Sequence, residues 1–254
     1  MTSETSRRAV LAAFLGLTAC AGGERVEGLE LKLGLTTARA RRAPPHVPEA
    51  RVLLTDEGVS AALSGALFTL GSVELLPCPE TGWRRLFRGL SPVGTAWAHS
   101  TSNARRLGSP QVLGLGRWDG DVVELGVLHP PPGRYCHARL TFEPADADAH
   151  GLDSAAAGGE PVDMVGRSLH LRGTVATGSG PEGRAFRVDA RGVASVDVAL
   201  DALTLSEEAP TASLVFALAW DMWLDGVGPG ERPEDQDVLG NVARSASLRS
   251  TAVP

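Results

Sequence analysis

Acidic and histidine side chains offer the clearest prospect of chemistry in this 254-residue sequence. Asp146, Asp148 and His150 stand at alternate positions before Gly151. This spacing is typical of the first half of a calcium-binding loop, in which successive oxygens face one cation. The second half is missing, because Ala157 occupies the position of the bidentate glutamate. We therefore reject an EF-hand and expect either a weaker calcium site in this loop or a solvated acidic turn.

Three histidines form the other candidate metal site. Imidazole nitrogens suit copper and zinc, which makes His99, His137 and His170 candidate ligands. His137 and His170 fall on the polar faces of two expected strands and would approach each other if these strands paired. The alternative is that each imidazole is solvated or held by a single hydrogen bond.

Large side chains cluster at the end of the most apolar segment of the sequence. Trp220 and Trp223, with Asp225 close behind, follow a run that is apolar on both faces. A cluster of this kind either plugs the core above a capped turn or lines a ligand pocket.

Motifs of the common catalytic centres are absent from the sequence. It contains neither a His-Glu-x-x-His helix nor a Gly-x-Ser-x-Gly elbow. With Lys32 as the only lysine, it offers no Walker lysine and no Schiff-base site. We therefore expect a protein that is not an enzyme, and keep a hydrolase site assembled from distant residues as the weaker alternative.

The first 20 residues have the order of a secretory signal. Arg7 and Arg8 precede an apolar run over residues 9–17, which is too short to cross a bilayer of about 30 Å as a helix. The run ends in Leu17-Thr18-Ala19-Cys20, which resembles the bacterial lipobox. The resemblance implies that residues 1–19 are removed and that Cys20 receives the lipid. An ordinary secretory signal with an incidental cysteine is the alternative.

This resemblance also implies a cellular location. Ala21 follows Cys20 in place of an aspartate, which in diderm bacteria resembles lipoproteins sent to the outer membrane. The segment around Arg7 and Arg8 resembles a twin-arginine export motif as well. We expect a protein anchored in the cell envelope, with the membrane as its partner through several acyl chains, such as palmitate.

Two cysteines remain once Cys20 is lipidated. Cys78 and Cys136 would then lie in an oxidising compartment, where an even pair is expected to form a disulfide. Cys136 alternates with Ala138 and Leu140, so we expect its sulfur to point into the core. A thiolate or metal-ligand pair is the alternative, but it lacks the Cys-x-x-Cys spacing.

Composition and periodicity predict the fold. The sequence contains 30 glycines, 17 prolines and 5% aromatic residues, which favours short strands joined by turns. We predict a mainly β fold: an antiparallel β-sandwich over residues 51–254, with long loops and a short C-terminal helix after Asp235 or Asp237, behind a lipidated tether over residues 20–50. Within this tether, Leu29-Glu30-Leu31-Lys32-Leu33 alternates like a strand, so the alternative is that this segment adds to the body. The expected strands cover Leu63–Leu76, Val122–Leu128, Tyr135–Phe142, Ser168–Val175, Phe186–Val188, Ala194–Leu200 and the central Ala212–Trp220.

These features favour a binding role. A net charge of −6 argues against nucleic-acid partners, because phosphate binding needs a concentrated positive field. In general character, the chain resembles the periplasmic copper-binding proteins associated with methanobactin handling, because it combines a lipid anchor, a sandwich, histidines and tryptophans. This resemblance identifies no ligand residues in the chain. We expect a non-enzymatic binding or interaction module without a cofactor. The alternative is an extracytoplasmic carrier of copper, zinc or calcium.

Overall fold

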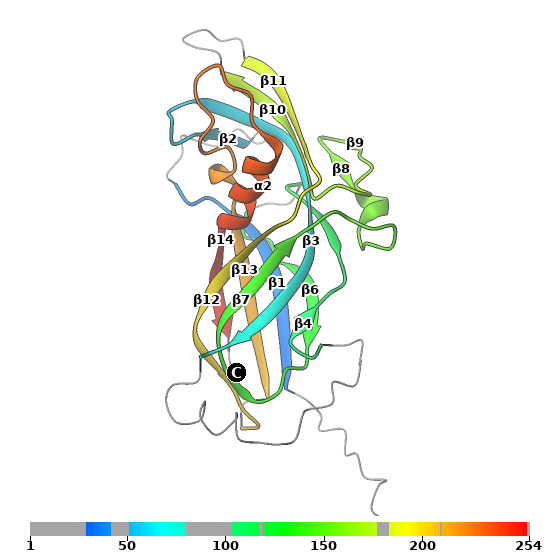
Figure 1. The fold of residues 1–254 in the computed structure, drawn as a ribbon, viewed down its shortest axis with the longest axis vertical. Coiled ribbons are helices and arrows are strands. Elements are labelled where there is room, and N and C mark those ends of the chain that lie inside the picture. Colours follow the sequence, from blue (N-terminus) through cyan, green and yellow to red (C-terminus); the bar gives the residue numbers. More distant parts are fainter. Residues whose placement is uncertain are drawn as a thin grey trace, which may run out of the picture.

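The computed structural model describes residues 29–41, 51–79, 103–116, 119–176, 183–208 and 210–252. The lipobox with Cys20 and the candidate ligand His99 lie outside the described residues. The fold is mainly β, as predicted, and the long strand β3 (Ser60–Pro77) runs along most of the molecule (Figure 1). All seven predicted strands are present.

One sheet has four strands in the order β14-β13-β1-β6. The strand β13 lies between two neighbours, which confirms that the segment apolar on both faces is central. Parallel pairing joins β1 to β13, so the sandwich is not wholly antiparallel. The bounds are β1 (Glu30–Ala38), β6 (Val123–Leu128), β13 (Thr211–Ala219) and β14 (Ala246–Ala252).

The position of β1 corrects the predicted domain boundary. Residues 30–38 were assigned to the tether, with a strand added to the body as the alternative for residues 29–33. The alternative holds, because residues 30–38 pair along their full length with β13 and also with β6. Leu31, Leu33 and Leu35 of β1 are buried in the core. The folded body therefore begins before residue 51.

The second sheet is organised around β3. One edge of β3 pairs first with β10 and then with β7, and its other edge pairs in turn with β2, β5 and β4. The strands β11 and β12 extend the sheet beyond β10 and β7. The bounds are β2 (Arg51–Leu54), β4 (Arg106–Leu107), β5 (Gln111–Gly114), β7 (Gly133–Phe142), β10 (Leu169–Ala176), β11 (Gly183–Ala190) and β12 (Ala194–Leu205).

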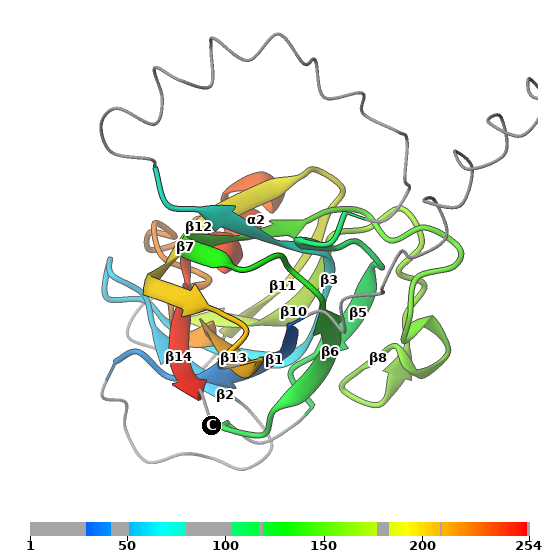
Figure 2. The ribbon, with the colours of Figure 1, turned by 90° about the horizontal axis from the view of Figure 1, so that it is seen from below.

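The two sheets enclose one main core. Seen from below, β14, β13 and β1 face β12, β7 and β3 (Figure 2). The ring of Phe68 on β3 meets those of Phe142 and Trp223 edge-on, with centroids 6.1 and 5.9 Å apart. Such pairs add to the stabilisation that comes from burying the rings.

The predicted C-terminal helix is α2 (Asp235–Arg244). Its buried face includes Val238, Leu239 and Val242, as the helical spacing predicts. The N-cap is Glu234, without a side-chain hydrogen bond, so neither Asp235 nor Asp237 caps the helix. Both carboxylates lie instead in the first turn, where a negative charge favours the helix dipole.

The long segment between β7 and β10 forms a small second core. It contains the 3₁₀ turn η1 (Leu152–Ser154) and the hairpin of β8 (Ala156–Ala157) and β9 (Glu160–Pro161). Its buried Met164 and several alanines pack with Leu67 on the outer face of β3. Close approach needs Gly65, where an added Cβ would lie 2.8 Å from Ala157. The middle of β3 is therefore covered on both faces.

A disulfide joins Cys78 and Cys136, as predicted. The expected direction of the Cys136 side chain was wrong, because Cys136 is partly exposed while Tyr135 is buried. The pairing of β7 with β3 shifts between Leu76 and Pro77, and this irregularity moves Tyr135 onto the core face. A bulge reverses the face of every residue beyond it.

Candidate functional site

The two tryptophans after β13 belong to the core. Neither Trp220, in the 3₁₀ turn η2 (Trp220–Met222), nor Trp223 has exposed surface. Trp223 Nε1 donates to Ser245 Oγ at 3.1 Å. Complete burial of both rings favours the core plug over the predicted ligand pocket.

Asp225, the third member of the predicted pocket, helps to fix the turn. It accepts two hydrogen bonds from the guanidinium of Arg41, at 2.8 and 2.5 Å. The buried carboxylate of Asp221 accepts the backbone N–H groups of Ala40 and Arg41, at 2.9 and 2.8 Å. The two aspartates thus tie the segment after β1 to the segment after β13.

A second polar network surrounds Trp220. The guanidinium of Arg39 lies 4.3 Å from the ring centroid and that of Arg51 lies 5.1 Å away, both in cation–π contact. Partial burial raises the pKa of Asp119, but the hydrogen bond from Trp220 and the charge of Arg51 outweigh it, so the pKa lies below its usual value. These groups are committed to one another and form a structural clamp.

The structure separates the predicted histidine ligands. His137 pairs with Leu76 and His170 with Leu67, nine residues earlier on β3 and about 30 Å away at the rise of a strand. The condition for their approach is therefore not met, since β7 and β10 each pair with β3 and not with each other. Within the described ranges, no three His, Cys, Asp or Glu side chains gather as they would to hold a metal ion.

His170 is buried and held by one carboxylate. Its Nδ1 lies 2.9 Å from Asp189 Oδ1, and the guanidinium of Arg187 donates to Oδ2 of the same group. Arg167 approaches Asp189 to 3.5 Å. Partial burial raises the pKa of Asp189, but hydrogen bonds from His170 and Arg187 bring it below its usual value. His170 is therefore a structural partner within the sheet.

The acidic segment before Gly151 is a surface turn. Asp146, Asp148 and His150 are all exposed. The backbone of His150 exchanges hydrogen bonds with residues on either side of the start of β5, at 2.8 Å each. This arrangement matches the solvated acidic turn, the second of the two alternatives.

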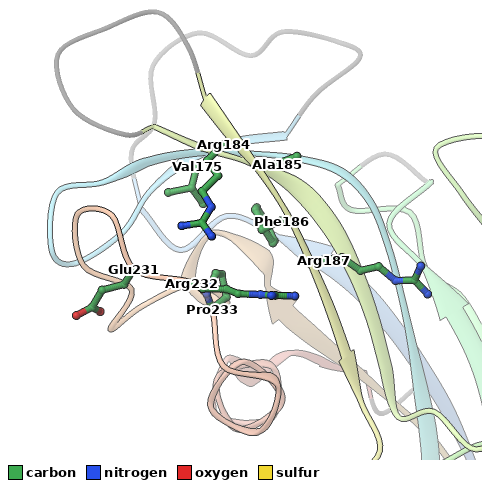
Figure 3. Close-up of a pocket in the computed structure, with 8 residues that line it drawn as sticks. All are labelled: Val175, Arg184, Ala185, Phe186, Arg187, Glu231, Arg232 and Pro233. Carbon is green, nitrogen blue, oxygen red and sulfur yellow. The ribbon is translucent and has the colours of Figure 1, made fainter.

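The strongest candidate site is a pocket of about 310 Å³ between β11 and the loop before α2 (Figure 3). Its floor consists of the apolar side chains of Val175, Phe186 and Pro233, which are buried. Arg184 reaches from β11 towards the loop, and Arg232 extends back beneath Phe186 (Figure 3). The complete lining is Val175, Arg184, Ala185, Phe186, Arg187, Glu231, Arg232 and Pro233.

The charges around this pocket are unbalanced. Arg184 and Arg232 form no hydrogen bond or ion pair with any residue in the described part of the chain. Arg187 points away and is held by Asp189, and the carboxylate of Glu231 accepts the N–H of Gly228 at 3.0 Å. Two guanidinium groups are therefore available above an apolar floor, an arrangement that suits an anion carrying an apolar part.

A wider hollow of about 730 Å³ lies between residues 103–109 and the end of β6. Arg106 and His129 are the titratable side chains among its described lining residues. Its described lining thus carries one permanently charged side chain, that of Arg106. This hollow therefore offers fewer charged groups to a ligand than the pocket of Arg184 and Arg232, here called the arginine pocket.

Sequence reasoning missed the arginine pocket. Arg184 alternates with Phe186 and Val188 on the inner face of β11, so an arginine on an otherwise apolar face was the available signal. Arg232 comes from a loop 48 residues later, and no local pattern links the two.

No family model, no curated protein and no solved structure matches this chain. Among the described residues, no helix is both long and apolar enough to cross a membrane.

Proposed function

We propose that this chain is a lipid-anchored protein of the cell envelope whose β domain binds an anionic ligand, without catalysis, in the pocket of Arg184 and Arg232. The observation that carries the proposal is the pair of guanidinium groups that have no partner among the described residues and stand over Val175, Phe186 and Pro233. Arginine holds carboxylates and phosphates through two parallel hydrogen bonds, and the apolar floor adds contact area.

The size of the pocket supports a small ligand or one segment of a larger one. Its volume of about 310 Å³ is at the lower end of the range for small-molecule sites, roughly 300 to 1,000 Å³. Glu231 is the one carboxylate among its described lining residues, and it accepts the N–H of Gly228; no histidine, cysteine, serine or threonine lies beside it in the lining, which favours binding over catalysis.

The position of the pocket agrees with a tether at Cys20. Eight residues separate Cys20 from Leu29, where the described fold begins, so the two Cα atoms can lie at most about 30 Å apart. β1 starts at the end of the molecule opposite the β10–β11 pair (Figure 1). A lipid on Cys20 would hold that end near the membrane and leave the pocket facing the aqueous compartment.

A fluorescent probe tests the proposed binding. The dye 8-anilinonaphthalene-1-sulfonate combines one anionic group with aromatic rings, so it matches both halves of the pocket. We expect saturable binding to the chain from Ala21 to Pro254, at least tenfold weaker for the double variant Arg184→Gln, Arg232→Gln, since each charged hydrogen bond contributes roughly 1.5–3 kcal/mol. Arg134→Gln, at an exposed arginine outside the pocket, is the matched control. Equal binding by the double variant and the control would refute the proposal.

A further inference from the structure

The strand β11 forms an open edge of the larger sheet. It pairs with β10 on one side, and the described residues place no strand on its other side. The pocket is lined by the consecutive residues 184–187, whose side chains alternate between the two faces of the sheet. Because consecutive residues line it, the pocket reaches the backbone of β11 as well as the face of the sheet, where Val175 of the neighbouring β10 also lines it.

Backbone hydrogen bonds identify the residues that face this edge. The carbonyl of Ala190 accepts the N–H of Ser168, on the β10 side. The N–H of Asp189 donates instead to a carboxylate at the start of α2, at 3.3 Å. Backbone groups of successive residues point to opposite sides of a strand, so those of Ala185 and Arg187 face the free edge as those of Asp189 do. They are the groups that an added strand would bond.

The charges beside the edge select the partner. Arg184, Arg187 and Arg232 line the pocket together with the single acid Glu231. A second copy of this chain paired edge to edge through β11 would bring arginines against arginines, which is unfavourable. A strand with acidic side chains would instead place its carboxylates beside Arg184 and Arg232.

We infer that the pocket binds an extended acidic peptide segment, which adds to the sheet as a strand along the free edge of β11. This inference rests on the proposed function and narrows the ligand to a peptide. Main-chain hydrogen bonds to Ala185 and Arg187 supply affinity, as in other cases of strand addition. Carboxylates near Arg184 and Arg232, with an apolar side chain against Phe186, supply specificity.

A synthetic peptide tests the inference. The probe is fluorescein-labelled Thr-Glu-Thr-Val-Thr-Glu-Thr-amide, which presents two glutamates and one valine on one face in either strand direction. Its binding to the chain from Ala21 to Pro254 is measured by fluorescence anisotropy. We expect saturable binding that weakens at least tenfold for Arg184→Gln with Arg232→Gln. Loss of binding is also expected when alternate peptide N–H groups are methylated, because these variants keep every side chain but lose the main-chain donors.

Variants at Ala185 separate strand addition from simple anion capture. Ala185→Pro removes an N–H at the free edge, a position where proline is tolerated, and should abolish peptide binding while leaving the sulfonate dye bound. Ala185→Ser keeps the N–H and should bind both. If methylated and unmethylated peptides bind equally, or if the dye binds and the peptide does not, strand addition is wrong and the anion site alone survives. If neither binds, the proposed function fails as well.

Discussion

The indole Nε1 of Trp220 lies 3.1 and 3.0 Å from the two carboxylate oxygens of Asp119, 101 residues away in the sequence. Thr37 Oγ1 and the guanidinium of Arg51 donate to the same carboxylate. This one acidic group therefore connects the end of β1, the start of β2 and the end of β13. Among the described residues, Asp119 is the only hydrogen-bond acceptor of this fully buried indole.

Replacing Asp119 should destabilise the fold. Asp119→Ala leaves the indole N–H of Trp220 buried without an acceptor, and we expect the free energy of unfolding to fall by about 2–3 kcal/mol. Urea denaturation followed by tryptophan fluorescence measures the change. Asp121→Ala, at a neighbouring exposed acid, serves as the control and should have little effect. Equal stability of the two variants would show that the clamp contributes nothing.

Stability should also fall in acid. The pKa values of Asp119 and Asp189 lie below their usual value in the folded chain. Depressed values mean that the stabilisation is complete above the unfolded pKa of about 3.9 and is lost as the pH falls through the lower folded values. We therefore expect a constant melting temperature above about pH 5 and a decline below about pH 4. Thermal melts from pH 2 to 7 should show a shallower decline for Asp119→Asn, and an unchanged decline would contradict this assignment.

The disulfide should be a major source of stability. It closes a separation of 58 residues, which on the chain-entropy model corresponds to about 4 kcal/mol. Cys78→Ala with Cys136→Ala should lower the free energy of unfolding by an amount of this order. A reductant should destabilise the parent chain and leave the double variant unaffected. Detection of two free thiols in the oxidised parent chain would overturn the pairing.

Local alternation carries enough information to predict most strands. Leu169, Leu171 and Val175 on β10 alternate with polar residues, because one face of that strand packs in the main core. Alternation over residues 29–33 indicated a strand at β1, but its place in the body stayed an alternative to the tether, since its main partner is remote: Leu33 pairs with Leu214. Prolines after β1 favoured a tether, and nothing local reveals a contact across 181 residues.

Irregular pairing and side-chain placement were harder to foresee. The direction of Cys136 depends on a bulge, and strict alternation cannot register one inserted residue. His170 follows a polar pattern but is buried, because the segment between β7 and β10 covers the outer face of the sheet. The arginine pocket forms because the loop before α2 lies close to β11 in the fold. The periodicity of either segment does not predict that they are close.

Asn241 should be among the most sensitive residues of α2. Its side-chain amide donates to the carbonyls of Trp223 and Asp225, at 3.1 and 2.8 Å, and so connects the helix to the turn after β13. Asn241→Ala leaves these carbonyls unsatisfied, and we expect a loss of about 2 kcal/mol in the free energy of unfolding. Gln236→Ala, at an exposed position on the same helix, should cost less than about 0.5 kcal/mol. Similar losses in urea denaturation would show that the bridge is unimportant.

Membrane attachment should depend on Cys20. If this cysteine carries several acyl chains, the full chain produced in a diderm bacterium should sediment with membranes and enter the detergent phase of a Triton X-114 separation. Attachment by acyl chains scales with the buried CH₂ groups, about 0.8 kcal/mol each, so no other contact is needed to hold the protein. Cys20→Ala should move the protein to the aqueous phase, whereas Cys78→Ala with Cys136→Ala should leave partition unchanged. Continued membrane partition of Cys20→Ala would mean that another part of the chain makes the attachment, and the lipobox interpretation would be abandoned.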